Sequence, residues 1–183
     1  MLIDKSEVLI ERLEHPWPTA FLGFADRTTL NSLASVRTAH RLAPGQAVLY
    51  ALHRGRVIGC TSWYQEYRHT YVALDGTAVH AMGVYLCSSE VLPGFRGMGI
   101  GSMLYGHRLT ECGGDAPGVS VEILGQGSPL SVDSEARPGL VWHLARGFTI
   151  VGHSCEADAG PVLTRPTPSS RRTAPFLAEH HVC

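Results

Sequence analysis

The chain has little of what marks several protein classes. Its 183 residues carry a formal net charge of -1 and a single lysine, Lys5, so the composition gives no reason to expect a nucleic-acid partner. No run of 18 apolar residues occurs, and the N-terminus is too acidic and its apolar part too short for a signal peptide. We therefore expect no membrane span and no membrane partner.

Cysteine pairs are also missing. The sequence has five cysteines, an odd number, and no two of them form a C-x-x-C motif. They are Cys60, Cys87, Cys112, Cys155 and Cys183. This spacing argues against a disulfide framework and against a zinc site, so we expect no metal and a cytoplasmic location. His180 and His181 stand near Cys183, but three potential ligands at a terminus indicate a solvated tail.

The residues that are present describe a globular protein. Hydrophobic residues make up 44% of the chain and charged residues 17%, and the length suits one α/β domain. From Pro166 onward Thr, Pro, Ser and Arg dominate. We therefore expect a single domain over residues 1–165 and a flexible tail over residues 166–183.

Apolar patterns and turn residues predict the order of the elements. We expect a helix over Glu7–Leu13, a strand over Ala20–Phe24, a helix from Arg27 to about Leu42 with Asp26 as its N-cap, a hairpin of Ala47–Leu52 and Val57–Tyr64, a polar connection over Gln65–Thr77, a long strand over Val79–Val91, a helix to about Glu111, a strand over Val119–Leu124, a helix over Pro138–Gly147, and strands over Phe148–His153 and Pro161–Arg165.

One segment between the long strand and the next helix carries a chemical signal. An apolar strand ends at a Pro-Gly turn, Arg96 follows, and Gly97, Gly99 and Gly101 occupy every second position up to the helix. Without a Cβ atom these residues let backbone N–H groups approach an anion, and the positive end of the helix dipole points at it. The segment predicts a phosphate-binding loop. It does not fit the dinucleotide fingerprint, which needs a glycine at Ser102, nor a Walker loop, which needs a lysine.

This loop resembles the pyrophosphate loop of the GNAT superfamily of acyltransferases, whose pattern is Arg/Gln-x-x-Gly-x-Gly/Ala after a strand. Here the residues read R-G-M-G-I-G from Arg96 to Gly101. The resemblance implies an α/β fold with a mixed central sheet of six to seven strands flanked by helices on both faces. It also implies acetyl-CoA as co-substrate. The implied cofactor-binding residues are Val91, Arg96, Gly97, Met98, Gly99, Ile100, Gly101 and Ser102.

A second segment adds to the resemblance. Family members carry a helix of the type Asn-x-x-Ala-x-x-Leu-Tyr-x-x-x-Gly-Phe, and the present chain matches its ending at Gly147 and Phe148. His143 stands at the tyrosine position and Ala136 at the asparagine position, which are departures from the pattern. The resemblance spans about Ala47–Arg165.

Acetyl transfer to an amine needs a general base and a proton donor for the leaving thiolate. The resemblance points to a glutamate on the central strands, so Glu90 is the first candidate base and Glu122 the second. His143 is the candidate acid and Tyr105 the reserve. Each has an ordinary alternative: an exposed strand-end carboxylate for Glu90, a surface ion pair for Glu122, and a structural histidine for His143. We interpret Cys87 on the long strand as a residue that packs in the core rather than as a nucleophile.

The leading hypothesis is an N-acetyltransferase in which a primary amine of a small molecule or peptide attacks acetyl-CoA directly. The aromatic segment Trp63–Tyr71 and Trp17 are candidates for lining the acceptor pocket, although Trp63 and Tyr67 also suit the core of the hairpin. Two alternatives stay open: a protein N-terminal or lysine acetyltransferase, and a non-catalytic acyl-CoA binding module. A homodimer is a further possibility that the sequence leaves open.

Overall fold

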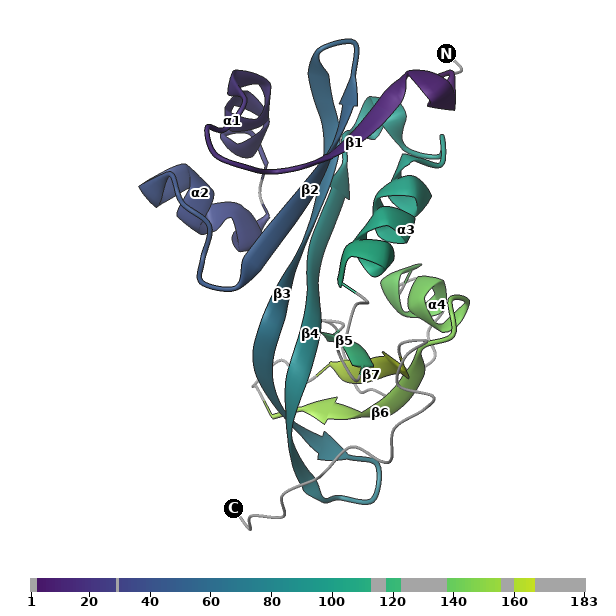
Figure 1. The fold of residues 1–183 in the computed structure, drawn as a ribbon. Coiled ribbons are helices and arrows are strands. Elements are labelled where there is room, and N and C mark those ends of the chain that lie inside the picture. Colours follow the sequence, from purple (N-terminus) through teal and green to yellow (C-terminus); the bar gives the residue numbers. More distant parts are fainter. Residues whose placement is uncertain (1–2, 29, 113–117, 123–137, 156–159, 167–183) are drawn as a thin grey trace. The chain divides into compact units, whose positions relative to one another are not determined.

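The computed structural model describes residues 3–28, 30–112, 118–122, 138–155 and 160–166 (Figure 1). Its elements, in chain order, are the short 3-10 helix η1 (Lys5–Glu7), β1 (Val8–Arg12), α1 (Thr19–Ala25), η2 (Asn31–Leu33), α2 (Ala34–Ala39), β2 (Gln46–His53), β3 (Arg56–Ala73), β4 (Ala78–Val91), η3 (Pro93–Phe95), α3 (Ile100–Cys112), β5 (Gly118–Glu122), α4 (Pro138–Leu144), β6 (Thr149–Ser154) and β7 (Pro161–Pro166). None of the described helices is long and apolar enough to cross a membrane.

The strands are hydrogen-bonded in the order β1, β2, β3, β4, β5, β7, β6, which makes a sheet of seven strands. β4 and β5 are parallel, with Val84 opposite Val119 and Leu86 opposite Val121. The pairs β1–β2, β2–β3, β3–β6, β5–β7 and β6–β7 are antiparallel. The predicted mixed sheet of six to seven strands is confirmed.

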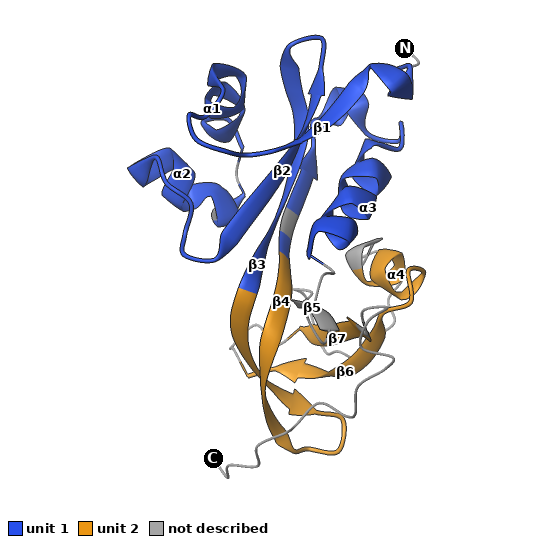
Figure 2. Ribbon diagram, viewed as in Figure 1, with its two compact units in different colours: residues 1–65, 87–112 blue, residues 66–86, 113–183 orange. Residues whose placement is uncertain are grey.

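The chain divides into two compact units (Figure 2). Unit 1 comprises residues 1–65 and 87–112, and unit 2 comprises residues 66–86 and 113–183. β3 and β4 each contribute residues to both units. The single domain over residues 1–165 stays a prediction, and the predicted tail lies outside the described residues beyond its first member, Pro166, which ends β7.

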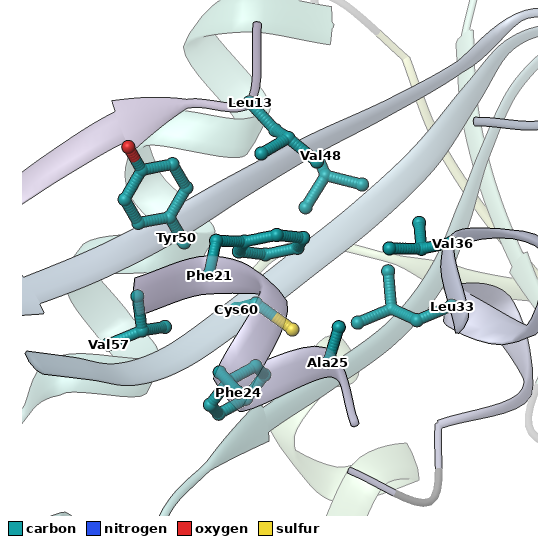
Figure 3. Packing of buried hydrophobic residues seen from close by; sticks show 10 residues of the cluster. All are labelled: Leu13, Phe21, Phe24, Ala25, Leu33, Val36, Val48, Tyr50, Val57 and Cys60. Carbon is teal, nitrogen blue, oxygen red and sulfur yellow. The ribbon is translucent and has the colours of Figure 1, made fainter. Parts of the chain in front are cut away.

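The core of unit 1 lies between the two early helices and the β2–β3 hairpin (Figure 3). Its buried members are Leu13, Phe21, Phe24, Ala25, Leu33, Val36, Val48, Tyr50, Val57 and Cys60. Phe21, Phe24 and Ala25 have the i, i+3, i+4 spacing that puts side chains on one face of a helix. Within unit 1, α1 and α2 cover one face of the strands and α3 the other, so the predicted helices on both faces are confirmed (Figure 1).

The predicted hairpin between β2 and β3 is confirmed at its turn. His53 pairs with Arg56, and the two residues between them have positive φ angles, 49° for Arg54 and 75° for Gly55. Two left-handed residues form the two-residue turn whose twist matches that of the flanking strands. The turn therefore sets the register of the two central strands of unit 1.

The predicted helix over Glu7–Leu13 is wrong. Residues Val8–Arg12 form β1, which pairs antiparallel with β2 from Val8 opposite His53 to Arg12 opposite Leu49. The sequence shows apolar residues at Val8, Leu9 and Leu13, a spacing that a short segment can satisfy in either state. The edge of β2 supplies hydrogen bonds to the backbone, and this tertiary pairing decides in favour of the strand.

The predicted strand over Ala20–Phe24 is also wrong, because these residues lie in α1. Pro18 precedes the helix, and its carbonyl accepts hydrogen bonds from the amides of Phe21 and Leu22 at 2.9 and 3.1 Å. A short apolar run does not distinguish a buried strand from a buried helix. Burial of one helical face against β2 and β3 decides the state of this segment.

The helix predicted from Arg27 to about Leu42 is reduced to η2 and the six-residue α2. Asp26 is the C-cap of α1 rather than an N-cap. The Arg37 Nη1 atom donates to the carbonyls of Thr28 and Leu30 at 3.1 and 3.0 Å, which holds these two residues outside a helix. A side chain from the following helix thus takes the carbonyls that a continuous helix would use.

The predicted connection over Gln65–Thr77 is mostly strand. β3 continues to Ala73, and a tight turn follows in which Gly76 has a φ of 87°. The other predicted elements are confirmed with small shifts at their ends: β4, α3, β6 and β7 match, α4 ends at Leu144 instead of Gly147, and residues 123–124 of the predicted fifth strand lie outside the described residues.

Candidate active site

The glycine-rich loop joins β4 to α3 within unit 1. β4 ends at Val91, η3 makes one tight turn, and α3 begins at Ile100, which is 1% exposed and anchors the helix in the core. Gly97 has a φ of 74° and Gly99 a φ of 85°, a backbone region that other residues rarely adopt. The predicted alternation of glycines is therefore a requirement of the loop geometry at these two positions.

The loop carries hydrogen-bond donors. Arg96 is exposed, and its Nε atom donates to the carbonyl of Val91 at 2.9 Å, which folds the guanidinium back toward the strand end. Among the described residues no backbone carbonyl accepts from the amides of Gly97 or Gly99. Unpaired amides next to the start of a 13-residue helix form an arrangement that binds anions.

The structure brings the predicted cofactor-binding residues together in one segment. Gly101 packs close to Val91, since a Cβ atom on Gly101 would lie 3.8 Å from Val91 Cγ2. Met98 is half-buried and Ser102 is exposed at the start of α3. The remaining members are the arginine and the glycines described above, so all eight residues lie at the end of β4 and the beginning of α3.

Glu90 lies directly before this loop, and its side chain is on the side of α1 and α2. The hydroxyl of Thr28 donates a hydrogen bond to Glu90 Oε2. Thr28 is only 7% exposed, and its own hydroxyl oxygen accepts from the amide of Leu30 at 3.3 Å. Because Arg37 holds the backbone of the same loop, the carboxylate is kept in place by a chain of contacts that begins in α2.

A glycine on the neighbouring strand allows the end of β4 to come close. A Cβ atom on Gly59 would lie 2.7 Å from the carbonyl oxygen of Glu90 and 3.3 Å from Val91 Cα. Leu92 in turn donates its amide to the carbonyl of Ile58 at 2.9 Å. β3 therefore needs a residue without a side chain at Gly59 to support the backbone of Glu90 and Val91.

Two cysteines near the site are unsuited to nucleophilic catalysis. Burial, with a smaller contribution from the negative charge of Glu90, raises the pKa of Cys60 to about 12. Burial also raises the pKa of Cys87 to about 11, although Arg108 acts in the opposite direction. Because the thiolate is the reactive form, both side chains behave as small apolar groups near neutral pH.

Tyr105 and Arg108 form a buried pair on α3. Arg108 is 1% exposed, its Nη1 atom donates to the carbonyls of Ser62 and Cys87 at 3.3 and 3.5 Å, and its guanidinium lies 5.0 Å from the centre of the Tyr105 ring. Burial lowers the pKa of Arg108 to about 10. Tyr105 lies on α3, whereas the Glu90 carboxylate is bonded to Thr28, which follows α1, and the described part of the chain shows no contact between these two predicted residues.

Comparison with known proteins identifies the family. A model of the acetyltransferase (GNAT) family matches residues 9–119, which is more than half of the chain and includes Glu90 and the glycine loop. The chain belongs to the GNAT acetyltransferase family. No curated protein matches the sequence.

Solved structures show the same fold at low identity. The ribosomal-protein-S18-alanine N-acetyltransferase of Escherichia coli is 14% identical, with a TM-score of 0.57 over 87% of this chain and 94% of that one. A GNAT family acetyltransferase from Elizabethkingia anophelis, solved with acetyl-CoA bound, is 14% identical with a TM-score of 0.55 over 88% and 99%. Arabidopsis thaliana Naa50, in complex with the bisubstrate analogue CoA-Ac-MVNAL, is 14% identical with a TM-score of 0.51 over 87% and 98%.

The remaining catalytic candidates of this GNAT protein lie in unit 2. His143 on α4 is 8% exposed, and its ring makes edge contacts with Trp142 and Phe148 at centroid distances of 5.3 and 5.2 Å. Glu122 is the last residue of β5 and stands opposite Val162 of β7. The side chain of Glu122 lies outside the described residues.

The aromatic residues proposed for the acceptor pocket separate into two groups. Trp63 is 1% exposed in unit 1, and its Nε1 atom donates to Gln65 Oε1 at 3.0 Å, which favours a role in the hairpin core. In unit 2, Tyr67 stacks on Tyr85 at 4.4 Å, and His69 contacts Tyr85 edge-on at 5.4 Å. A role for these residues in an acceptor pocket stays a prediction.

Sequence reasoning missed three residues that support the site. Thr28 gave no signal, because its partner Glu90 is 62 positions away. Gly59 interrupts an apolar run, and an isolated glycine within a strand is a sign of close backbone approach. Arg108 gave no signal either, since its helix shows only that one face is buried, not which strand carbonyls lie beneath it.

Proposed function

We propose that this GNAT protein transfers the acetyl group of acetyl-CoA to a primary amine of a small molecule or peptide by direct attack. One observation carries the proposal: a half-buried carboxylate, Glu90, held by Thr28, stands at the end of the strand that leads into a loop in which the amides of Gly97 and Gly99 have no backbone acceptor within the described part of the chain. The family supplies the reaction class, and the loop supplies the part that binds the co-substrate.

The loop and the strand end hold the co-substrate in this proposal. Amides between Arg96 and Gly101, together with the first turn of α3, bind the diphosphate, and the backbone of Val91 pairs with the pantetheine arm. Two left-handed glycines shape this surface in the absence of ligand. The backbone therefore loses little conformational freedom on binding. The residues present therefore fit a diphosphate.

Glu90 is the proposed general base. It removes one proton from the ammonium form of the acceptor, the amine nitrogen forms a bond to the acetyl carbon, the carbon–sulfur bond breaks, and the second proton of the nitrogen passes to water as the amide forms. An acid protonates the leaving thiolate, and as the family resemblance implies, His143 is the candidate for this role and Tyr105 the reserve. Glu122 is the second candidate base. The hydrogen bond from Thr28 restricts the rotamers of Glu90 and so fixes the direction from which it accepts a proton.

A non-catalytic acyl-CoA binding module is the second candidate function. It is favoured by the buried position of His143 between two aromatic rings, which suits a structural histidine as well as an acid. Changing His143 to Ala separates these roles. A proton donor predicts lower turnover and an altered pH profile at unchanged CoA affinity, and unchanged turnover together with an unchanged pH profile would remove His143 from the mechanism.

The acceptor class and the location are also part of the proposal. A protein N-terminus or lysine remains the alternative acceptor, and a peptide panel beside small amines distinguishes the two. Cys60, Cys112 and Cys155 form no disulfide within the described residues, which supports a reducing compartment such as the cytoplasm.

The experiment that tests the function is amine-dependent release of CoA. The purified protein is incubated with acetyl-CoA, a panel of amines and peptides, and a thiol-detecting reagent, while calorimetry measures CoA binding separately. We expect thiol release that depends on the amine. Binding without release supports the non-catalytic module. Absence of binding, with no further change in the double variant Arg96→Glu, Gly99→Val, would overturn the assignment of the loop.

A further inference from the structure

The only lysine of the chain lies against the glycine loop. Lys5 belongs to η1, directly before β1, and is 94 residues away from Gly99 in sequence. A Cβ atom on Gly99 would lie 2.8 Å from Lys5 Nζ and 3.0 Å from its Cε. The end of the lysine side chain therefore occupies the space beside a loop residue whose φ is 85°.

The acidic neighbours of Lys5 have other partners. Asp4 accepts from the amide of Ser6 at 2.9 Å, and hydrogen bonding to the side chain and then to the backbone of Ser6 lowers the pKa of Asp4. Glu7 contacts Arg54 at 2.9 Å and His53 at 3.2 Å. Within the described parts of the chain, the Lys5 ammonium makes no hydrogen bond and no ion pair. A cation thus stands at the loop without a carboxylate to neutralise it.

Other positive groups reach the same loop. Arg96 is part of it, and the guanidinium of Arg56 lies 5.8 Å from the centre of the Phe95 ring. The loop amides of Gly97 and Gly99 also lack backbone acceptors among the described residues. A diphosphate offers oxygen acceptors to several donors at once, so a single anion can join the Lys5 ammonium to the loop amides.

We propose that Lys5 is a binding residue for the diphosphate of the co-substrate, supplied to the loop by the N-terminal segment. This inference rests on the proposed function, because it takes the loop to be the co-substrate site. β1 keeps the lysine in reach: its pairing with β2 begins at Val8, three residues after Lys5. A short connection to a hydrogen-bonded strand therefore keeps the Lys5 ammonium close to the loop.

Calorimetry on the full chain tests the proposal with CoA and with dephospho-CoA, which keeps the diphosphate but lacks the 3′-phosphate. We expect Lys5→Gln to weaken both ligands equally, by about tenfold, the loss of one charged hydrogen bond. Lys5→Arg should keep most of the affinity, because it keeps the charge. Arg54→Gln is the matched control: it removes an exposed cation that is paired with Glu7.

Each outcome separates the two proposals. Failure of the wild-type protein to bind CoA would overturn the proposed function itself. Tight binding by the wild type with unchanged affinity in Lys5→Gln would overturn only the role of Lys5. If Lys5→Gln lost affinity for CoA but not for dephospho-CoA, the lysine would contact the 3′-phosphate. That result would refute the assignment to the diphosphate. The difference between wild type and Lys5→Gln should also shrink at high salt, since the contact is exposed.

A pair of glycine variants gives a second measurement. Gly97→Ala and Gly99→Ala both force a side chain into a positive φ, but only the second would meet Lys5, since nothing lies within 4 Å of a Cβ on Gly97. We expect Gly99→Ala to weaken CoA more than Gly97→Ala in the wild-type background. The difference should disappear when Lys5 is Gln. Persistence of the same difference without the lysine would contradict the proposal.

Discussion

The two regions at the end of β4 handle polar groups in opposite ways. On the α1–α2 side, Glu90 is paired with Thr28, whose backbone is held by Arg37. In the loop that follows, the amides of Gly97 and Gly99 have no backbone acceptor among the described residues. The protein thus builds the surroundings of its candidate base from its own side chains, whereas we propose that an external anion supplies the acceptors for the loop.

The largest expected effect comes from removing the carboxylate. Glu90→Gln keeps the shape and still accepts the hydrogen bond of Thr28, but it no longer takes a proton. We expect kcat to fall by about 10²- to 10⁴-fold, the range for loss of a general base, with little change in CoA affinity. CoA release at several pH values is the measurement. Glu14→Gln, an exposed carboxylate, is the control, and a kcat within about threefold of wild type would exclude Glu90 as the base.

The support beneath Glu90 is tested by Gly59→Ala. Its Cβ atom would lie 2.7 Å from the Glu90 carbonyl oxygen, so the end of β4 must shift. We expect a loss of about 1–3 kcal/mol in the free energy of unfolding, measured with urea, and lower turnover. Gly23→Ala in α1 is the matched control, since its Cβ meets nothing within 4 Å and should leave stability equal or higher. Equal stabilities would contradict the close approach.

A smaller effect is expected from the hydrogen bond to the base. Thr28→Val keeps the volume but removes the hydroxyl that holds the Glu90 carboxylate in place, so turnover at neutral pH should fall by about tenfold. Thr28→Ser keeps a hydroxyl and should restore turnover, with CoA release as the measurement. A purely structural role for Thr28 would lower stability without changing the turnover of the folded variant.

The smallest effect concerns reactivity rather than activity. With its pKa raised to about 12, Cys60 has roughly one thiolate in ten thousand at pH 8, whereas an ordinary cysteine has a substantial fraction. Iodoacetamide labelling followed by mass spectrometry should modify the exposed Cys155 first and Cys60 last, with the Cys60 rate rising as pH increases. Equal labelling rates for Cys60 and Cys155 would mean that solvent reaches the side of β4 that carries Glu90. The contrast between an enclosed base and an exposed loop would then be wrong.

Sequence patterns predicted the two halves of the molecule unequally. β4, the glycine loop and α3 follow from local signals, because glycine spacing and a long apolar run specify them within a few residues. The segment before β2 was mispredicted at three places. There the state of each short piece depends on a partner outside it: β1 on the edge of β2, α1 on the hairpin beneath it, and Thr28 and Leu30 on Arg37.

The residues of the candidate site also fall into those that local sequence predicts and those that only tertiary contacts reveal. The amino-acid order alone determined the loop from Arg96 to Ser102 and the family, because a left-handed backbone and close anion approach demand glycine at particular positions. Only the tertiary structure showed that Thr28 pairs with Glu90, that Gly59 makes room for its carbonyl, and that Lys5 reaches Gly99. Such contacts join residues 31 to 94 positions apart, and their identity depends on strand pairing that no local pattern encodes.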